Sequence, residues 1–208
     1  MDASERESFE QEVRGLTEAE KHNEAVSRLI EGYGPEILSY LLSNMGNEDE
    51  ATQAYSDFCV NALKGLPRFR WQSSLRTWSY RIAARCRADF YRFRHRRKAY
   101  DHVGLSQSPA IGEVAERVRT QTLQYVKTSV KDRFSDLRDK LKPEDRDLLV
   151  LHVNRKLTFN EIAEIQWEGE EEMTEEDLKR GAARLRARFH RLKGKLRELA
   201  RKEGLIGG

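Results

Sequence analysis

The sequence predicts an all-α protein of two small helical domains joined by a flexible linker, the second with a helix-turn-helix. Three observations lead to this fold. Apolar side chains recur at three- and four-residue steps through most of the 208 residues, which is the period of amphipathic helices. Glycine, serine and proline break that period between residues 99 and 113. Two capping-box sequences then follow each other near the C-terminus, and such a box typically begins a helix.

The first predicted domain occupies residues 23–98. It follows an acidic N-terminal extension, residues 1–22, which we expect to be only partly ordered. The apolar steps between Val26 and Leu41 predict a pair of helices, with Pro35 in the first turn of the second one.

Two further helices complete this predicted domain. Gly46-Asn47 ends the helical pair, and the acidic residues that follow it favour the positive end of a helix that Pro67 ends. A short loop, residues 68–73, leads to a long helix over residues 74–98.

The linker is expected at residues 99–118 and the second domain at residues 119–208. Residues 158–161 (Thr-Phe-Asn-Glu) form a capping box that begins a short helix, and residues 174–177 (Thr-Glu-Glu-Asp) form a second box that begins a long last helix. An acidic turn separates the two helices, and the second helix is basic. This order is typical of a helix-turn-helix.

The formal net charge of +3 hides a strong segregation of charge. Residues 68–98 hold eleven basic residues and one acid, and residues 178–202 hold the same numbers, while the remaining 152 residues carry −17. Two separate basic blocks in an acidic chain indicate two contacts with a polyanion.

The last helix has an apolar face and a basic face. Its apolar side chains, from Leu178 to Leu199, keep within one stripe, and basic side chains lie on the opposite side. We expect the first half of this helix to lie in the major groove of duplex DNA. The alternative is a solvated helix surface without a ligand. The basic side chains are Arg180, Arg184, Arg188, Arg191 and Lys195.

Residues 68–98 instead interleave basic and aromatic side chains. Bases stack on aromatic rings and phosphates pair with arginine, which is how single-stranded nucleic acid is held. Some of the aromatic residues must belong to the core, among them Trp78 and Phe90 on the apolar face. Trp71 in the loop, and Tyr80 and Tyr91 off the apolar stripe, are the better candidates for stacking.

Several functional classes are excluded by what the sequence lacks. It has no glycine-rich phosphate loop and no HExxH motif, and its five histidines fall on unrelated segments. Cys59 and Cys86 do not form a ligand-type pair and are expected to be reduced thiols. No apolar stretch approaches the length of a membrane span, and the acidic N-terminus is not a secretory signal. We therefore expect a cytoplasmic protein with no catalytic residue, no metal site, no cofactor and no membrane insertion.

One run of residues resembles a known family. Phe69-Arg70, Ser73-Ser74-Leu75-Arg76-Thr77-Trp78 and Tyr80-Arg81-Ile82-Ala83, followed by an arginine-rich tail, resemble the second conserved region of bacterial RNA polymerase sigma factors. The closest group is the extracytoplasmic-function group of the sigma-70 family. Residues 141–149, 157–164 and 188–199 resemble the fourth region of that family. This chain departs from it in the loop, where the common Gly-Asp is Trp71-Gln72.

The resemblance implies a sigma factor that binds core RNA polymerase, recognises and melts promoter DNA, and catalyses no reaction. By this resemblance core polymerase contacts Asp49, Glu50, Gln53 and Asp57. Recognition and melting of the minus-ten element would involve Arg68, Arg70, Trp71, Arg76, Thr77, Tyr80, Arg81, Arg85 and Tyr91. The minus-thirty-five element would be contacted by Arg180, Arg184, Arg188 and Arg191.

Two other classes stay open from the sequence. A stand-alone helix-turn-helix regulator would bind its operator without polymerase, but it leaves the aromatic–basic segment unexplained. A protein of the anti-sigma or adaptor type would act through protein contacts alone, with both basic blocks solvated. The sequence identifies neither the promoter nor an anti-sigma factor as a further partner.

Overall fold

The computed structural model describes residues 1–93, 108–128, 137–169 and 172–205. Contacts divide the chain into two units, Met1–Thr128 and Ser129–Gly208. Within the described residues the regular structure is entirely helical, which confirms the predicted all-α class. No helix in these ranges is both long and apolar enough to span a bilayer.

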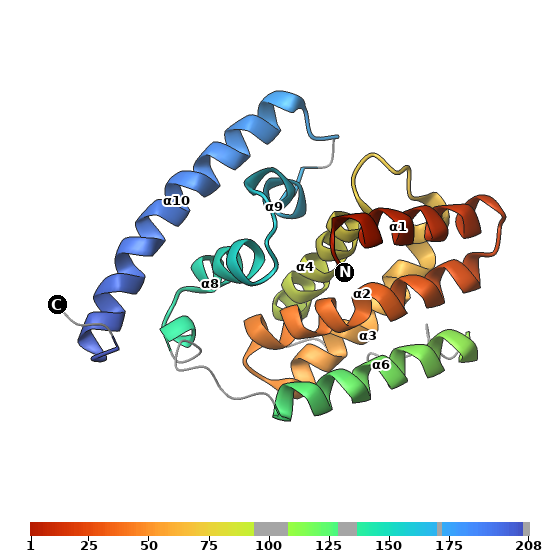
Figure 1. The fold of residues 1–208 in the computed structure, drawn as a ribbon, viewed down its shortest axis with the longest axis horizontal. Helices are drawn as coiled ribbons and strands as arrows, with labels where there is room; N and C mark the ends of the chain where they lie inside the picture. The colour runs from red at the N-terminus through yellow and green to blue at the C-terminus, as the bar shows by residue number, and fades with distance from the viewer. Residues whose placement is uncertain (94–107, 129–136, 170–171, 206–208) are drawn as a thin grey trace. The chain divides into compact units, whose positions relative to one another are not determined.

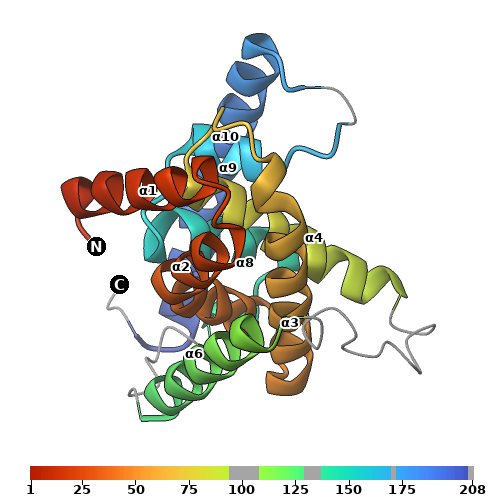
Figure 2. The same ribbon diagram turned by 90° about the vertical axis from the view of Figure 1, so that its right-hand side faces the viewer.

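The first unit is built around one central helix, α2, which contacts α1, α3, α4 and α6. Helices α1 and α6 lie on opposite sides of it (Figures 1 and 2). The helices of this unit are α1 (Ala3–Glu18), α2 (His22–Met45), α3 (Glu48–Gly65), the short 3₁₀ helix η1 (Leu66–Arg68), α4 (Leu75–Phe93) and α6 (Pro109–Thr128).

Helix α2 is continuous, so the predicted helical pair is wrong. Pro35 lies inside it, where a proline removes one backbone hydrogen bond. Tyr33 and Ile37 on either side of the proline are buried, so packing holds both halves of the helix in place. The predicted turn at Gly46 is confirmed, because this glycine ends α2 with a φ of 66°.

Two glycines let neighbouring helices approach α2 closely. A Cβ at Gly32 would overlap the ring of Phe9 from α1. A Cβ at Gly34 would lie 2.6 Å from the Tyr55 hydroxyl of α3 and 3.0 Å from Val118 of α6. The sequence Gly-Tyr-Gly-Pro therefore serves helix packing here rather than a turn.

The acidic N-terminal segment is a packed helix rather than a partly ordered extension. Asp2 and Glu5 form a capping box at the start of α1. Phe9 and Val13 are buried against α2, and the Glu12 carboxylate lies 2.8 Å from Nε of Arg28 on α2. Burial of two apolar side chains outweighs the acidic composition that led us to expect partial order.

The boundary between the two units lies later than predicted. Residues 99–107 of the predicted linker fall outside the described residues, but its last ten residues belong to α6. This helix packs on α2 through Ile111, Ala115 and Val118, and its Arg117 lies 2.6 Å from Glu31. Residues 119–128, predicted to begin the second domain, are therefore part of the first unit.

The second unit packs three shorter elements against one long helix. Its core contains Leu148, Leu151 and Ile162 from the shorter elements and Leu185 and Leu192 from the long helix. The elements are α8 (Pro143–Leu149), the π-helical turn η2 (Val150–Asn154), α9 (Phe159–Ile165) and α10 (Glu175–Lys202).

Both predicted capping boxes are confirmed. The Thr158 hydroxyl accepts from the backbone N–H of Glu161 at the start of α9, and Thr174 and Asp177 make the equivalent pair at the start of α10. Helices α9 and α10 lie close together at Gly181, where a Cβ would lie 3.1 Å from the Ala163 side chain.

Candidate nucleic-acid interface

An aromatic cluster joins the loop between η1 and α4 to the beginning of α4. The ring of Phe69 lies 4.9 Å from that of Trp71 and 4.9 Å from that of Trp78, measured between centroids. Trp71 has a φ of 59°, in the left-handed region that bulky residues rarely adopt. The guanidinium of Arg14, from α1, lies 5.7 Å from the centroid of the Trp71 ring. The loop thus presents a half-buried indole held in a costly backbone conformation.

The start of α4 is held by two carboxylates from other helices. Glu10 of α1 accepts hydrogen bonds from the backbone N–H groups of Leu75 (2.9 Å) and Arg76 (3.0 Å). Glu36 of α2 accepts from Nε of Arg76 (3.1 Å) and from the hydroxyl of Tyr80 (2.9 Å). These bonds fix both the backbone and the side chains of the first turn of α4.

Three predicted DNA contacts are corrected by this arrangement. Arg76 and Thr77 are buried, and Tyr80 is 0 % exposed with its ring edge against Tyr40. None of the three presents a surface to a nucleic acid in this structure. The helical period placed Tyr80 off the apolar stripe, but α2 covers this second face of α4 and so buries it.

The remaining candidates of this unit lie at or near the surface. Arg68, Arg70 and Arg85 are exposed, and Arg81 is half-buried. Tyr91 is 43 % exposed, and its hydroxyl donates to the carbonyl of Met45 at the end of α2.

The sequence did not indicate Phe69 or Arg14 as parts of this surface. Phe69 could have been found from its place in the aromatic run. Arg14 lies more than fifty residues away along the chain, and no local signal relates it to the loop.

The predicted polymerase-contacting residues lie on α3. The Asn47 side chain caps this helix by accepting from the N–H groups of Asp49 and Glu50. Asp49 is exposed, whereas Glu50, Gln53 and Asp57 are half-buried. The spacing of residues 49, 53 and 57 puts these three side chains on one face of the helix.

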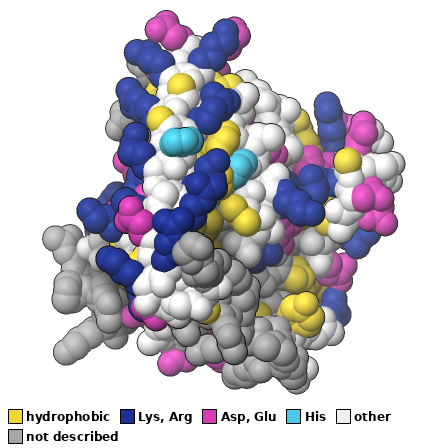
Figure 3. Space-filling view, turned by 60° about the vertical axis from the view of Figure 1, so that its left-hand side comes forward, with side chains coloured by type: hydrophobic (Ala, Val, Ile, Leu, Met, Phe, Trp, Pro, Cys, Tyr) yellow, Lys and Arg dark blue, Asp and Glu magenta, His cyan; other side chains and the backbone are white. Residues whose placement is uncertain are grey.

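In the second unit α10 has the predicted two faces. Its apolar stripe is buried at Ala182, Leu185 and Leu192 and half-buried at its other positions. Lys and Arg side chains gather along the face that Figure 3 brings forward. Arg180 is occupied within the helix, because it pairs with Asp177 at 3.0 Å and approaches Glu176 at 3.8 Å. Arg184 and Arg191 are exposed, and no ion pair engages them within the part of the chain that the structure describes.

Arg188 has a structural contact that the sequence did not indicate. Its Nε donates to a carboxylate oxygen of Asp145 at 2.7 Å, and the Lys195 ammonium donates to the other oxygen at 3.2 Å. Asp145 belongs to α8 and its side chain is 6 % exposed. Burial by itself would raise the pKa of this carboxyl, but the hydrogen bonds from Arg188 and Lys195 hold the pKa below its ordinary value. Arg188 therefore fastens α10 to α8 in this structure.

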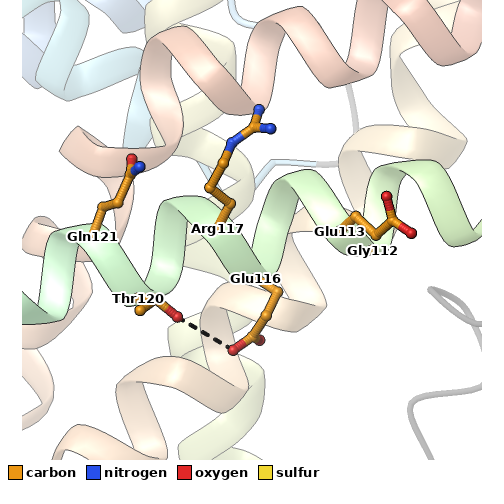
Figure 4. A pocket seen from close by; sticks show the side chains of 6 residues that line it. All are labelled: Gly112, Glu113, Glu116, Arg117, Thr120 and Gln121. Carbon is orange, nitrogen blue, oxygen red and sulfur yellow. Dashed lines mark hydrogen bonds between the residues drawn. The ribbon is translucent and has the colours of Figure 1, made fainter.

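Two further features of the described residues concern possible ligand sites. These residues contain no group of three or more histidine, cysteine or acidic side chains placed to hold a metal ion. Figure 4 shows a hollow along α6, where Glu116 accepts a hydrogen bond from Thr120 and Arg117 pairs with Glu31 of α2. The hollow is lined by Gly112, Glu113, Glu116, Arg117, Thr120 and Gln121. Of these side chains, Arg117 joins α6 to α2 through its pair with Glu31.

The chain has the features of a DNA-binding protein. It is all-α, one unit has an aromatic–basic loop, and the other has a capped, basic second helix. Residues 29–97 match the family Sigma-70 region 2. The chain is 33 % identical over 148 residues to RNA polymerase sigma factor YlaC of Bacillus subtilis (strain 168), a match that covers 70 % of this chain and 81 % of that protein.

The chain therefore belongs to the extracytoplasmic-function group of the sigma-70 family of RNA polymerase sigma factors and directs transcription initiation. Membership implies core RNA polymerase and promoter DNA as its partners. The alternative of a stand-alone regulator is not favoured by these similarities. The family match includes the loop and α4 but begins after α1.

Proposed function

We propose that the two units contact promoter DNA in two different states. The first unit would open the minus-ten element and hold a single strand, and the second would bind the minus-thirty-five element as duplex. For the first unit, the proposal rests on the backbone conformation of Trp71.

A residue with a Cβ loses roughly 1–2 kcal/mol in the left-handed region. The family commonly has glycine at this place in the loop, which would avoid that cost. A large residue kept there despite the cost suggests a functional use. The half-buried indole lies against the ring of Phe69, and the exposed Arg68 and Arg70 come just before it in the chain. This combination suits an unpaired base with its phosphates.

Duplex contact by the second unit is supported by the two-sided form of α10. Ala182, Leu185 and Leu192 hold one face in the core, and Arg184 and Arg191 extend from the helix into solvent. These two arginines are seven residues apart, so they lie on the same side about 10 Å apart along the axis. That spacing suits two contacts within one major groove.

We propose that α3 provides the contact with core polymerase through Asp49, Glu50, Gln53 and Asp57. Acidic and amide side chains on one face of a helix favour a basic partner surface over the DNA backbone, which would repel them. Because both partners act on the chromosome, we place the protein in the cytoplasm and assign it no catalytic step.

Reconstitution with core RNA polymerase tests the proposal. The full chain should co-elute with core enzyme and direct specific transcripts from promoters that it selects from a genomic DNA library. On such a promoter, Trp71→Ala should reduce the permanganate reactivity of unpaired minus-ten thymines about tenfold, the loss expected for one stacked base. Trp71→Phe should retain part of the reactivity, because it keeps a π-face.

Gln72→Ala is the matched control, since Gln72 is an exposed neighbour in the same loop. If holoenzyme with Trp71→Ala opens promoter DNA normally, Trp71 has no role in strand opening. Failure of the wild-type chain to support any specific transcript would overturn the proposal as a whole.

A further inference from the structure

Glu10 makes contacts that its position in an acidic N-terminal helix does not suggest. Its carboxylate accepts three hydrogen bonds. Two come from the backbone of Leu75 and Arg76, and the third comes from the Tyr33 hydroxyl at 2.7 Å. The bonds join α1 to the first turn of α4 across 65 residues of sequence.

These bonds complete the N-terminal cap of α4. The first turn of a helix leaves its N–H groups without partners in the helix. Ser74 satisfies one of them by accepting from the N–H of Thr77 at 3.0 Å, and Glu10 satisfies those of Leu75 and Arg76. A carboxylate at this place also favours the positive end of the helix.

The same face of α1 reaches the aromatic loop. Arg14 follows Glu10 by one helical turn, and its guanidinium lies over the Trp71 ring while Glu18 fixes its Nε at 2.8 Å. Helix α1 itself is anchored, because Phe9 packs over Gly32 of α2. Residues 71–76 are thus contacted at both ends by the same helix.

We propose that Glu10 is a positioning residue for strand opening, and that α1 acts as a brace for the loop that carries Trp71. This inference rests on the proposed role of that loop at the minus-ten element. Glu10 does not touch DNA in this account. It fixes where the loop ends and α4 begins, and so sets the position of Trp71 before DNA binds.

A purely structural role for Glu10 makes a different prediction. In that case its loss would weaken every activity of the chain alike, including initiation on DNA that is already open. A positioning role for strand opening affects duplex promoters and spares pre-opened ones, so the two templates separate the alternatives.

The experiment compares Glu10→Ala and Glu10→Gln with the wild type in holoenzyme on a promoter that the wild type selects. Glu7→Gln is the matched control, because Glu7 is exposed on the same helix and loses the same charge. The rate of open-complex formation on duplex DNA should fall about tenfold for Glu10→Ala, since two backbone bonds to a charged acceptor are lost. The rate should fall less for Glu10→Gln, because the amide oxygen of glutamine can still accept a hydrogen bond. Glu7→Gln should match the wild type.

On a template with a non-complementary minus-ten segment, both Glu10 variants should initiate within about twofold of the wild type. An equal loss on both templates, or wild-type opening by Glu10→Ala on duplex DNA, would overturn the inference. Failure of the wild-type holoenzyme itself to open duplex DNA would instead overturn the proposed function.

A second measurement covers the case in which Glu10→Ala unfolds. In a background with Trp78→Phe and Trp167→Phe, fluorescence reports Trp71 alone. For Glu10→Gln, acrylamide should quench Trp71 more strongly than in the parent, while the unfolding midpoint shifts by no more than a few degrees. Unchanged quenching would show that Glu10 does not position the loop.

Discussion

The contact of Asp145 with Arg188 and Lys195 gives the sharpest test of how α10 is held. Asp145 is nearly buried at the start of α8, and both partners come from α10. Replacement by alanine removes two charge-assisted hydrogen bonds and frees α10 from α8 at this point. We therefore expect Asp145→Ala to destabilise the second unit.

The magnitude depends on how exposed the partners are. A hydrogen bond to a charged group contributes about 1.5–3 kcal/mol when both groups are desolvated. Arg188 is 36 % exposed and Lys195 is 56 % exposed, so water can solvate both charges after the substitution. Exposed ion pairs contribute about 0–1 kcal/mol. We expect about 1.5 kcal/mol for the bond to Arg188 and about 0.5 kcal/mol for the bond to Lys195, or about 2 kcal/mol together.

Unfolding of the second unit can be followed in the full chain. Trp167 is the sole tryptophan after residue 128, so a Trp71→Phe/Trp78→Phe background makes fluorescence report this unit alone. A loss of about 2 kcal/mol should lower the unfolding midpoint by roughly 8–16 °C in a unit of this size. In a double-mutant cycle, Asp145→Ala and Arg188→Ala should show a coupling energy of about 1.5 kcal/mol.

Glu144→Ala is the control for proximity and charge. Glu144 lies 3.5 Å from Arg188 but is 64 % exposed, and its removal should cost less than about 0.5 kcal/mol. A coupling energy near zero, or equal effects of the two alanine variants at positions 144 and 145, would refute the reasoning.

The same contact has a defined pH dependence. The pKa of Asp145 is lower in the folded protein than its ordinary value of 3.8, so unfolding takes up protons at this group. The stabilisation is then fully present above that ordinary value and is lost as pH falls through the lower pKa of the folded state. The stability difference between the wild type and Asp145→Ala should stay constant from about pH 7 to pH 5 and decrease below about pH 4.

Two further predictions concern α10 and α2. In a filter-binding assay, Arg184→Ala should weaken binding of the holoenzyme to upstream duplex DNA by about 1–3 kcal/mol if Arg184 reads a base. Arg197 is exposed on another side of α10, so Arg197→Ala should bind this DNA normally in the same assay. Gly34→Ala should destabilise the first unit by about 1–2 kcal/mol in urea unfolding, because the new Cβ would lie 2.6 Å from the buried Tyr55 hydroxyl. The higher helix propensity of alanine stabilises the helix by only about 1 kcal/mol and does not offset this overlap. Gly15→Ala, with no neighbouring atom within 4 Å of the new Cβ, should not destabilise, and equal effects of the two alanines would contradict the packing argument.

Local signals in the sequence predicted the local structure well. The Thr158 and Thr174 boxes form as expected because a capping box depends on residues only three positions apart. The apolar stripe of α10 is buried or half-buried for a similar reason, because its helical period can be recognised without knowing which helices pack against it. The prediction of a helix break at Pro35 was wrong, because α2 is kept continuous at this proline by packing against other helices.

The errors at the candidate site share one physical cause. A helical period shows which side chains lie together on a helix, but not how many of its faces are covered. Helix α4 is covered on more than one side, so Arg76 and Tyr80, which looked solvent-facing, are interior groups bonded to Glu36. The contact of Arg188 with Asp145 escaped the sequence analysis for a related reason, because the two residues lie 43 positions apart.

These internal pairings change what the charge segregation means. Each basic block carries eleven cations, but Arg76 and Arg188 are used within their own units, and Arg92 and Arg180 pair with acids on their own helices. The positive charge available to DNA is therefore smaller than the composition suggests. Electrostatic affinity for DNA scales with the number of phosphates that free cations neutralise. We therefore expect weak DNA binding by either unit alone, and tight binding only when polymerase holds both units on one promoter.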